Sequence, residues 1–205
     1  MIFGRLLLVA IVALAGCDGP GETDDAGDGV DSGNPLAGPH LAMGWQMRCV
    51  EGTCPPADAP ARMLDHDHGQ DGVEVRCDLQ FDGTTRRMDI TVRDPAGTGH
   101  GFEIRGAQIA EDGGRLMGSF CQIRVFEPDD VDLLTQCSSN SPTADTACQI
   151  SRIDIRDVLG VPTLLGELRC DGAPAEASRS QVRDVTSATS ASGNAAFTFT
   201  GCAGL

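Results

Sequence analysis

The cysteines limit the folds open to this chain more than any other feature. The sequence contains nine cysteines, and eight of them are spread from position 49 to position 202. An even number of cysteines scattered through one segment is typical of a disulfide framework in an exported protein. We therefore expect a domain cross-linked through Cys49, Cys54, Cys77, Cys121, Cys137, Cys148, Cys170 and Cys202.

The sequence leaves the pairing open, because eight cysteines allow about a hundred arrangements. Loop lengths favour two pairs. Cys49 and Cys54 are separated by VEGT, which suits a turn, and a Cys137–Cys148 bridge would close the polar stretch SSNSPTADTA. The other four cysteines would then link strands. A zinc site is the alternative, but it needs close thiolate pairs such as CxxC, and the sequence has none.

The hydrophobic pattern between the cysteines has a period of two residues, which indicates β-strands with one buried face. Val73–Leu79, Met88–Val92, Phe102–Ile104 and Cys121–Val125 alternate in this way. Asp82-Gly83 separates the first two segments and favours a hairpin between them.

The second half of the chain continues the pattern with one interruption. The alternation changes phase between Ile150 and Ile153, which predicts a bulge at Ser151-Arg152. Leu164–Cys170 and Ala195–Phe199 add further strands.

The fold class follows from these strands. Asp157–Leu165 could hold a helical turn, which Gly160 and Pro162 would keep short. Short strands, glycine-rich turns and cross-links together predict an all-β fold, an antiparallel β-sandwich or a jelly-roll-like domain held by disulfides.

The amino terminus has a different character. Arg5 is the only charged residue before Cys17, and Leu6–Ala15 has no polar side chain, as in a signal peptide. This run is about half of the roughly 20 residues that a helix needs to cross a bilayer. Leu14-Ala15-Gly16-Cys17 resembles the lipobox of bacterial lipoproteins.

The resemblance implies that residues 1–16 are removed and that Cys17 carries a diacylglycerol and, on its new amino group, an acyl chain such as palmitate. Two or more chains give stable anchoring where one does not. The alternative is an ordinary secretory signal with an incidental cysteine. The implied location is the cell envelope, at the outer membrane or the periplasmic face of the inner membrane, with the cell surface as a third option. Asp18 does not decide between them, because bacterial groups sort lipoproteins differently.

Three regions are expected. Residues 1–16 are the signal peptide, and residues 17–40 are an acidic linker rich in Gly, Asp and Pro that can bury little and should stay disordered. Residues 41–205 are one β domain. In style this domain resembles the small, cysteine-rich, uncharacterised lipoproteins of GC-rich Gram-negative bacteria.

Composition excludes several functions. The net charge is −15, so a nucleic-acid partner is not expected. All 15 basic residues are arginine, which excludes Schiff-base lysines and the phosphate-binding P-loop. Ser119 does not stand in a GxSxG elbow. His100, between glycines, could be a general base but is more typical of a turn, and no catalytic residue is predicted.

The densest group of polar residues is DHDHGQDG, at positions 65–72, which is expected to be a loop. His66 and His68 could bind zinc or copper, while Asp65, Asp67 and Asp71 could bind calcium. The alternative is an exposed polar loop without metal, and the same interpretation, a solvated loop, is given to Glu127–Asp130 and Thr186–Gly193.

Three functions remain open. The first is a non-catalytic module, tethered to the bilayer through Cys17, that binds an envelope protein or glycan or has a structural role; it needs no cofactor. The second is a metal-binding module that uses the DHDHGQDG segment. The third, a hydrolase, would need a cleft with paired carboxylates or an activated nucleophile.

Overall fold

The computed structural model describes residues 38–94, 99–111, 113–116, 121–138, 146–188 and 194–205. These residues form twelve β-strands in one connected sheet and a 3-10 turn, η1 (Gln70–Gly72). The strands are β1 (His40–Glu51), β2 (Arg62–Asp67), β3 (Glu74–Phe81), β4 (Thr85–Arg93), β5 (Gly101–Ala110), β6 (Gly113–Leu116), β7 (Cys121–Phe126), β8 (Leu133–Ser138), β9 (Cys148–Val158), β10 (Val161–Pro174), β11 (Val182–Ser187) and β12 (Ala195–Thr200). The all-β fold predicted from the sequence is confirmed.

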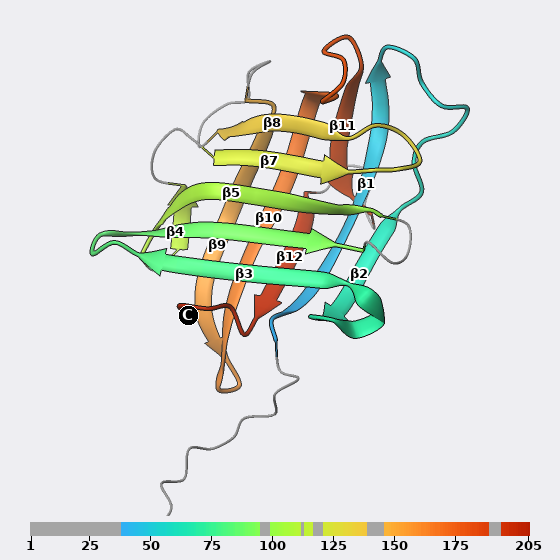
Figure 1. The fold of residues 1–205 in the computed structure, drawn as a ribbon. Helices are drawn as coiled ribbons and strands as arrows, with labels where there is room; N and C mark the ends of the chain where they lie inside the picture. Colours follow the sequence, from blue (N-terminus) through green and yellow to red (C-terminus); the bar gives the residue numbers. More distant parts are fainter. Residues whose placement is uncertain (1–37, 95–98, 112, 117–120, 139–145, 189–193) are drawn as a thin grey trace, which may run out of the picture. The chain divides into compact units, whose positions relative to one another are not determined.

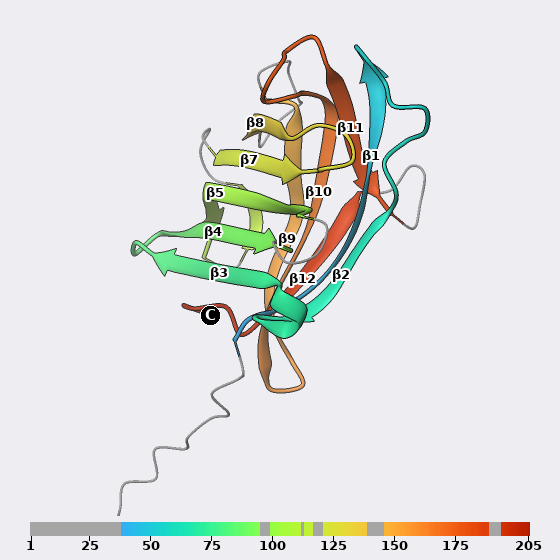
Figure 2. The same ribbon diagram turned by 45° about the vertical axis from the view of Figure 1, so that its right-hand side comes forward.

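The sheet folds over on itself to give two layers packed face to face (Figure 1). One layer has the order β3-β4-β5-β7-β8. The other runs from β2 through β1 to β10 and β9, and β11 and β12 lie end to end between β1 and β10. The strands of one layer cross those of the other (Figures 1 and 2), which is the orthogonal form of a β-sandwich. A short parallel pairing of β8 with β9, and β6 between β5 and β9, join the layers.

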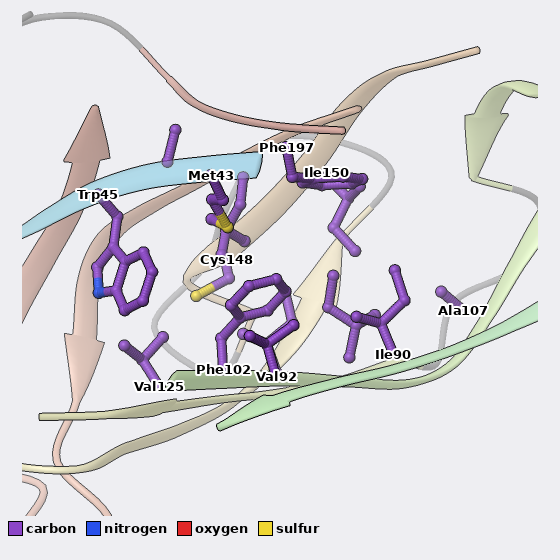
Figure 3. Packing of buried hydrophobic residues seen from close by; sticks show 14 of the residues in the cluster. Met43, Trp45, Ile90, Val92, Phe102, Ala107, Val125, Cys148, Ile150 and Phe197 are labelled. Carbon is purple, nitrogen blue, oxygen red and sulfur yellow. The ribbon is translucent and has the colours of Figure 1, made fainter. Parts of the chain in front are cut away.

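Apolar side chains from both layers meet between the sheets (Figure 3). Met43, Trp45 and Phe197 come from β1 and β12, while Ile90 and Phe102 come from β4 and β5. None of the five is more than 3% exposed. Trp45 and Phe102 pack edge to face with ring centroids 6.0 Å apart, an arrangement that aromatic pairs favour. This core fixes the two layers on each other.

The period-two segments form strands as predicted. The apolar residues of Val73–Leu79 and Met88–Val92 are buried, and these segments fall on β3 and β4 except for Val73, which directly precedes β3. Asp82-Gly83 forms the turn between them: the amide of Asp82 donates to the carbonyl of Thr85 at 3.0 Å. The side chain of Asp82 also accepts a hydrogen bond from the amide of Thr85 at 2.8 Å, so both the backbone and the side chain of Asp82 close this hairpin.

The predicted bulge is also present. The pairing of β9 with β10 shifts between Asp154 and Ser151, so that two residues of β9 oppose Gly166. Arg152 has a φ of 50°, a left-handed conformation that the extra residue requires. The bulge puts Ile150 and Ile153 on the same buried face.

The prediction of a helical turn within Asp157–Leu165 is wrong. β9 and β10 are joined by a two-residue turn, Leu159-Gly160, which the opposed pair Val158 and Val161 closes. Both turn residues have positive φ, 57° and 84°, as in a type I′ turn. The side chain of Asp157 accepts a hydrogen bond from the amide of Gly160 at 2.6 Å. A strand pair with a tight turn satisfies the backbone N–H and C=O groups of this segment better than one helical turn would.

All eight cysteines of the domain form disulfides. The Cys49–Cys54 pair predicted from loop length is confirmed and closes the segment after β1. Cys77 of β3 is bonded to Cys202, which follows β12. This bond ties the carboxyl-terminal segment to the opposite layer.

The predicted Cys137–Cys148 pair is wrong. Cys137 of β8 is bonded to Cys121 of β7, and Cys148 of β9 is bonded to Cys170 of β10. Each bond joins residues that lie directly opposite each other on antiparallel strands. Cys137 and Cys148 are themselves partners in the parallel pairing of β8 with β9, but the antiparallel neighbour takes the bond in both cases. The strand pairing, and not the loop length, selects the partner.

Candidate functional site

The segment predicted to be a polar loop begins in a strand, so that prediction is wrong for its first three residues. Asp65, His66 and Asp67 belong to β2, which pairs with β1. Side chains alternate across a strand, so Asp65 and Asp67 point outward while His66 lies on the side of the buried Leu64. The strand itself therefore separates Asp65 and Asp67, two of the predicted carboxylate ligands, from His66.

The two outward carboxylates flank His40 of β1. The Nε2 atom of His40 is 3.2 Å from Asp65 Oδ1, and its Nδ1 atom is 3.1 Å from Asp67 Oδ1. The Asp65 and Asp67 side chains are 81% and 60% exposed, so water screens both contacts. Exposed pairs of this kind contribute at most about 1 kcal/mol each.

The two imidazoles predicted to bind metal, those of His66 and His68, make separate contacts. Nδ1 of His66 lies 3.8 Å from Asp71 Oδ2 in η1. Nδ1 of His68 accepts a hydrogen bond from the backbone amide of Val75 at 3.2 Å. Within the part of the chain that the structure describes, no group of three or more His, Cys, Asp or Glu side chains could hold a metal ion. The structure places His66 beside Asp71 but does not gather the predicted metal ligands of the described residues into one site.

A buried cluster of charged residues lies on the inner side of the same strand. Arg62 of β2 is in phase with Leu64, and its side chain is 9% exposed. The guanidinium donates to both carboxylate oxygens of Glu127, whose side chain is fully buried, and to Asp129. These hydrogen bonds raise the pKa of Arg62 further above its usual value. The bidentate geometry fixes the loop after β7 against β2.

The same loop carries a second buried pair. Asp130 is 4% exposed and accepts from Nε and Nη2 of Arg183, at 2.6 and 2.8 Å. The remaining guanidinium hydrogens reach the carbonyls of Glu51, Thr53 and Val182, each at 3.0 Å. The hydrogen bonds to Asp130 and its negative charge raise the pKa of Arg183. All five N–H donors of this arginine thus have acceptors.

The prediction that Glu127–Asp130 is a solvated loop is therefore wrong for Glu127, which is buried, and for Asp130, whose side chain is 4% exposed; each carboxylate lies against an arginine. An acidic run can be internal when each carboxylate has a cationic partner with several donors. In the second predicted loop, Thr186 and Ser187 belong to β11, and positions 189–193 lie outside the described residues.

His100 lies at the edge of the Arg62 cluster. Its ring centroid is 5.8 Å from that of Trp45, and its Nδ1 atom is 3.9 Å from Asp94 Oδ2. Burial lowers the pKa of His100, and the nearby positive charge of Arg62 lowers it further. The ring is therefore neutral at neutral pH. A neutral imidazole could accept a proton, as a general base must, but this ring is 10% exposed and packs beside the buried Trp45.

Sequence reasoning missed Arg62, Glu127 and Arg183. A weak signal existed for one of them: Arg62 stands in phase with Leu64 and His66, as a residue of the inner face of a strand would. The carboxylate partners of these arginines are 53 to 67 residues away along the chain, so no local pattern identifies them.

No family model, no curated protein and no solved structure matches this chain.

In the described residues, none of the helical segments has the length and apolar character needed to span a membrane. Cys17, the predicted lipidation site, lies outside them.

Proposed function

We propose that this chain is a lipid-anchored protein of the bacterial envelope whose folded part is a non-catalytic module that binds an envelope component or has a structural role. The observation that supports this best is the use of the cysteines. Eight of the nine pair within the domain, and the ninth is Cys17, the cysteine of the lipobox-like segment. Four disulfides fit an oxidising compartment, and a single remaining thiol at the cleavage site fits lipidation.

The buried charges support a non-catalytic role. Arg183 uses all its donors on Asp130 and on backbone carbonyls, and Arg62 is held by Glu127 and Asp129. Groups whose hydrogen bonds are already satisfied within the fold stabilise loops. A catalytic group would need to remain available to a substrate.

Intact mass spectrometry of the membrane-extracted protein, with and without reduction, tests the anchor. We expect a chain that begins at Cys17, carries acyl chains, and gains eight hydrogens on reduction of its four disulfides. The Cys17→Ser variant should move from the membrane fraction to the soluble fraction. An unlipidated wild-type chain would overturn the proposal.

Cosedimentation tests the binding role. The soluble Cys17→Ser protein would be incubated separately with purified cell-wall sacculi and with envelope vesicles. We expect it to sediment with one of them and to release no soluble product, as a binding module would. Release of glycan or peptide fragments would instead favour the hydrolase.

A further inference from the structure

The turn between β9 and β10 exposes a cluster of apolar side chains. Leu159 is 99% exposed, and the opposed pair Val158 and Val161 is 41% and 44% exposed. Pro162 follows and is also exposed. Figures 1 and 2 show that this hairpin projects beyond the rest of the domain. We call the exposed residues Val158, Leu159, Val161 and Pro162 the apolar tip.

Folding does not explain Leu159. At φ 57° its side chain crowds the backbone, and type I′ turns strongly favour asparagine followed by glycine at these two positions. The leucine therefore strains the turn and gains nothing by burial, because its side chain lies in water. A residue that is both strained and exposed suggests a function outside the folded domain.

The apolar tip lies at the end of the domain where the chain enters it. Thr163 of β10 faces Thr200 of β12, and Thr200 faces His40, the first residue of β1. β1 and β10 are both antiparallel to β12, so they start at the same end. Leu159 precedes Thr163 by four residues and extends beyond that level by roughly 13 Å at the rise of a β-strand.

The segment that connects this end to the lipobox-like cysteine is short. Cys17 and Gly38 are 21 positions apart, and a fully extended chain of that length spans at most roughly 75 Å. A lipid on Cys17 therefore keeps the entry end of the domain within roughly 75 Å of the bilayer, and the apolar tip lies at that end. A tethered tip has a high effective concentration at the lipid surface, so a weak contact is sufficient.

We propose that the apolar tip inserts into the headgroup region of the bilayer that anchors Cys17; this inference rests on the proposed function. The small size of the tip favours lipid over a protein partner. Four side chains around a two-residue turn fall well short of the roughly 800 Å² that each partner buries in a stable protein interface. The net charge of −15 favours a zwitterionic surface over an anionic one.

A tryptophan placed at the tip tests the contact. The full-length Leu159→Trp protein would be expressed, purified from membranes and reconstituted into phosphatidylcholine vesicles with or without brominated acyl chains. The matched control is Val50→Trp, because Val50 is 54% exposed and lies near the opposite end of β1. The native Trp45 is 1% exposed and gives the same background in both.

We expect brominated lipid to reduce the emission of the tryptophan at position 159 by on the order of twofold, because interfacial insertion is roughly 5 to 10 Å deep. The tryptophan at position 50 should be unaffected. Unfolding midpoints and disulfide content, compared with the unsubstituted protein, check that both variants fold.

Mass spectrometry of the same samples separates the two ways to fail. An unlipidated chain would overturn the proposed function and this inference together. A lipidated chain without selective quenching at position 159 would overturn this inference alone and would leave the tip to a protein partner.

Discussion

Arg183 of β11 and Asp130 of the loop after β7 form an ion pair that is closed off from water. The arginine side chain is 0% exposed and the aspartate side chain is 4% exposed. Through its carbonyl partners Glu51 and Thr53, Arg183 also holds the segment that the Cys49–Cys54 disulfide closes. One guanidinium therefore joins three parts of the chain that are far apart in sequence.

Replacement of Arg183 by methionine should destabilise the domain strongly. The aspartate would be left buried without a partner, which costs about 3 to 5 kcal/mol in comparable pairs. The matched control is Arg169→Met, because Arg169 and Asp171 are 44% and 43% exposed and such pairs contribute about 1 kcal/mol or less. Urea unfolding followed by circular dichroism measures both. Equal losses in the two variants would contradict a special role for the buried pair.

His100 should make stability depend on pH. Its pKa is lowered in the folded state by burial and by Arg62, so the unfolded chain binds the proton more readily. Stability should therefore be greatest above the ordinary histidine pKa of 6.5 and should decrease as pH falls below it toward the folded-state value. The unfolding midpoint of the wild type should drop between about pH 7 and pH 5.

The His100→Gln variant should lack most of that decrease, since glutamine does not titrate. The His40→Gln variant is the control, because His40 lies at the surface between two carboxylates. If both variants keep the same pH dependence as the wild type, the titrating group is elsewhere.

The strands that could be predicted are those with one buried face that carries no charged residue. In Val73–Leu79 and Met88–Val92, alternation of side chains is a local property, so the sequence alone shows it. The bulge at Arg152 could be predicted for the same reason, because a change of phase is visible without knowledge of the partner strand.

The charged site could not be predicted, because its contacts are not local. The inner face of β2 carries Arg62, Leu64 and His66. Only Leu64 is apolar, so the sequence of this segment has a polar pattern. Arg62 is tolerated there because Glu127 arrives from another layer. The Cys137–Cys148 prediction failed similarly: loop length suggested a partner, whereas the antiparallel pairing of strands determined it.

Mapping of disulfide-linked peptides from a non-reduced digest should find Cys121–Cys137 and Cys148–Cys170. The loss of stability on removal of one disulfide should increase with the length of the loop that the disulfide closes, because the bond restricts the unfolded chain. Loss of Cys77–Cys202, with a separation of 125 residues, should cost about 5 kcal/mol, against about 2 kcal/mol for Cys49–Cys54, with a separation of 5. Paired cysteine-to-alanine variants and urea unfolding measure this order. A peptide that links Cys137 to Cys148 would show that the parallel partner, and not the antiparallel one, takes the bond.

Leu159→Asn should stabilise the domain although it removes an apolar side chain. Leu159 has a φ of 57° and is 99% exposed, so the substitution relieves strain and loses no buried surface. Because a left-handed conformation costs a branched residue roughly 1 to 2 kcal/mol and asparagine less, we expect a gain of about 1 kcal/mol in urea unfolding. Leu159→Ala keeps a strained Cβ and should stay within about 0.5 kcal/mol of the wild type. A loss of stability in Leu159→Asn would mean that the leucine packs against the fold, and its exposure would then no longer point to an outside partner.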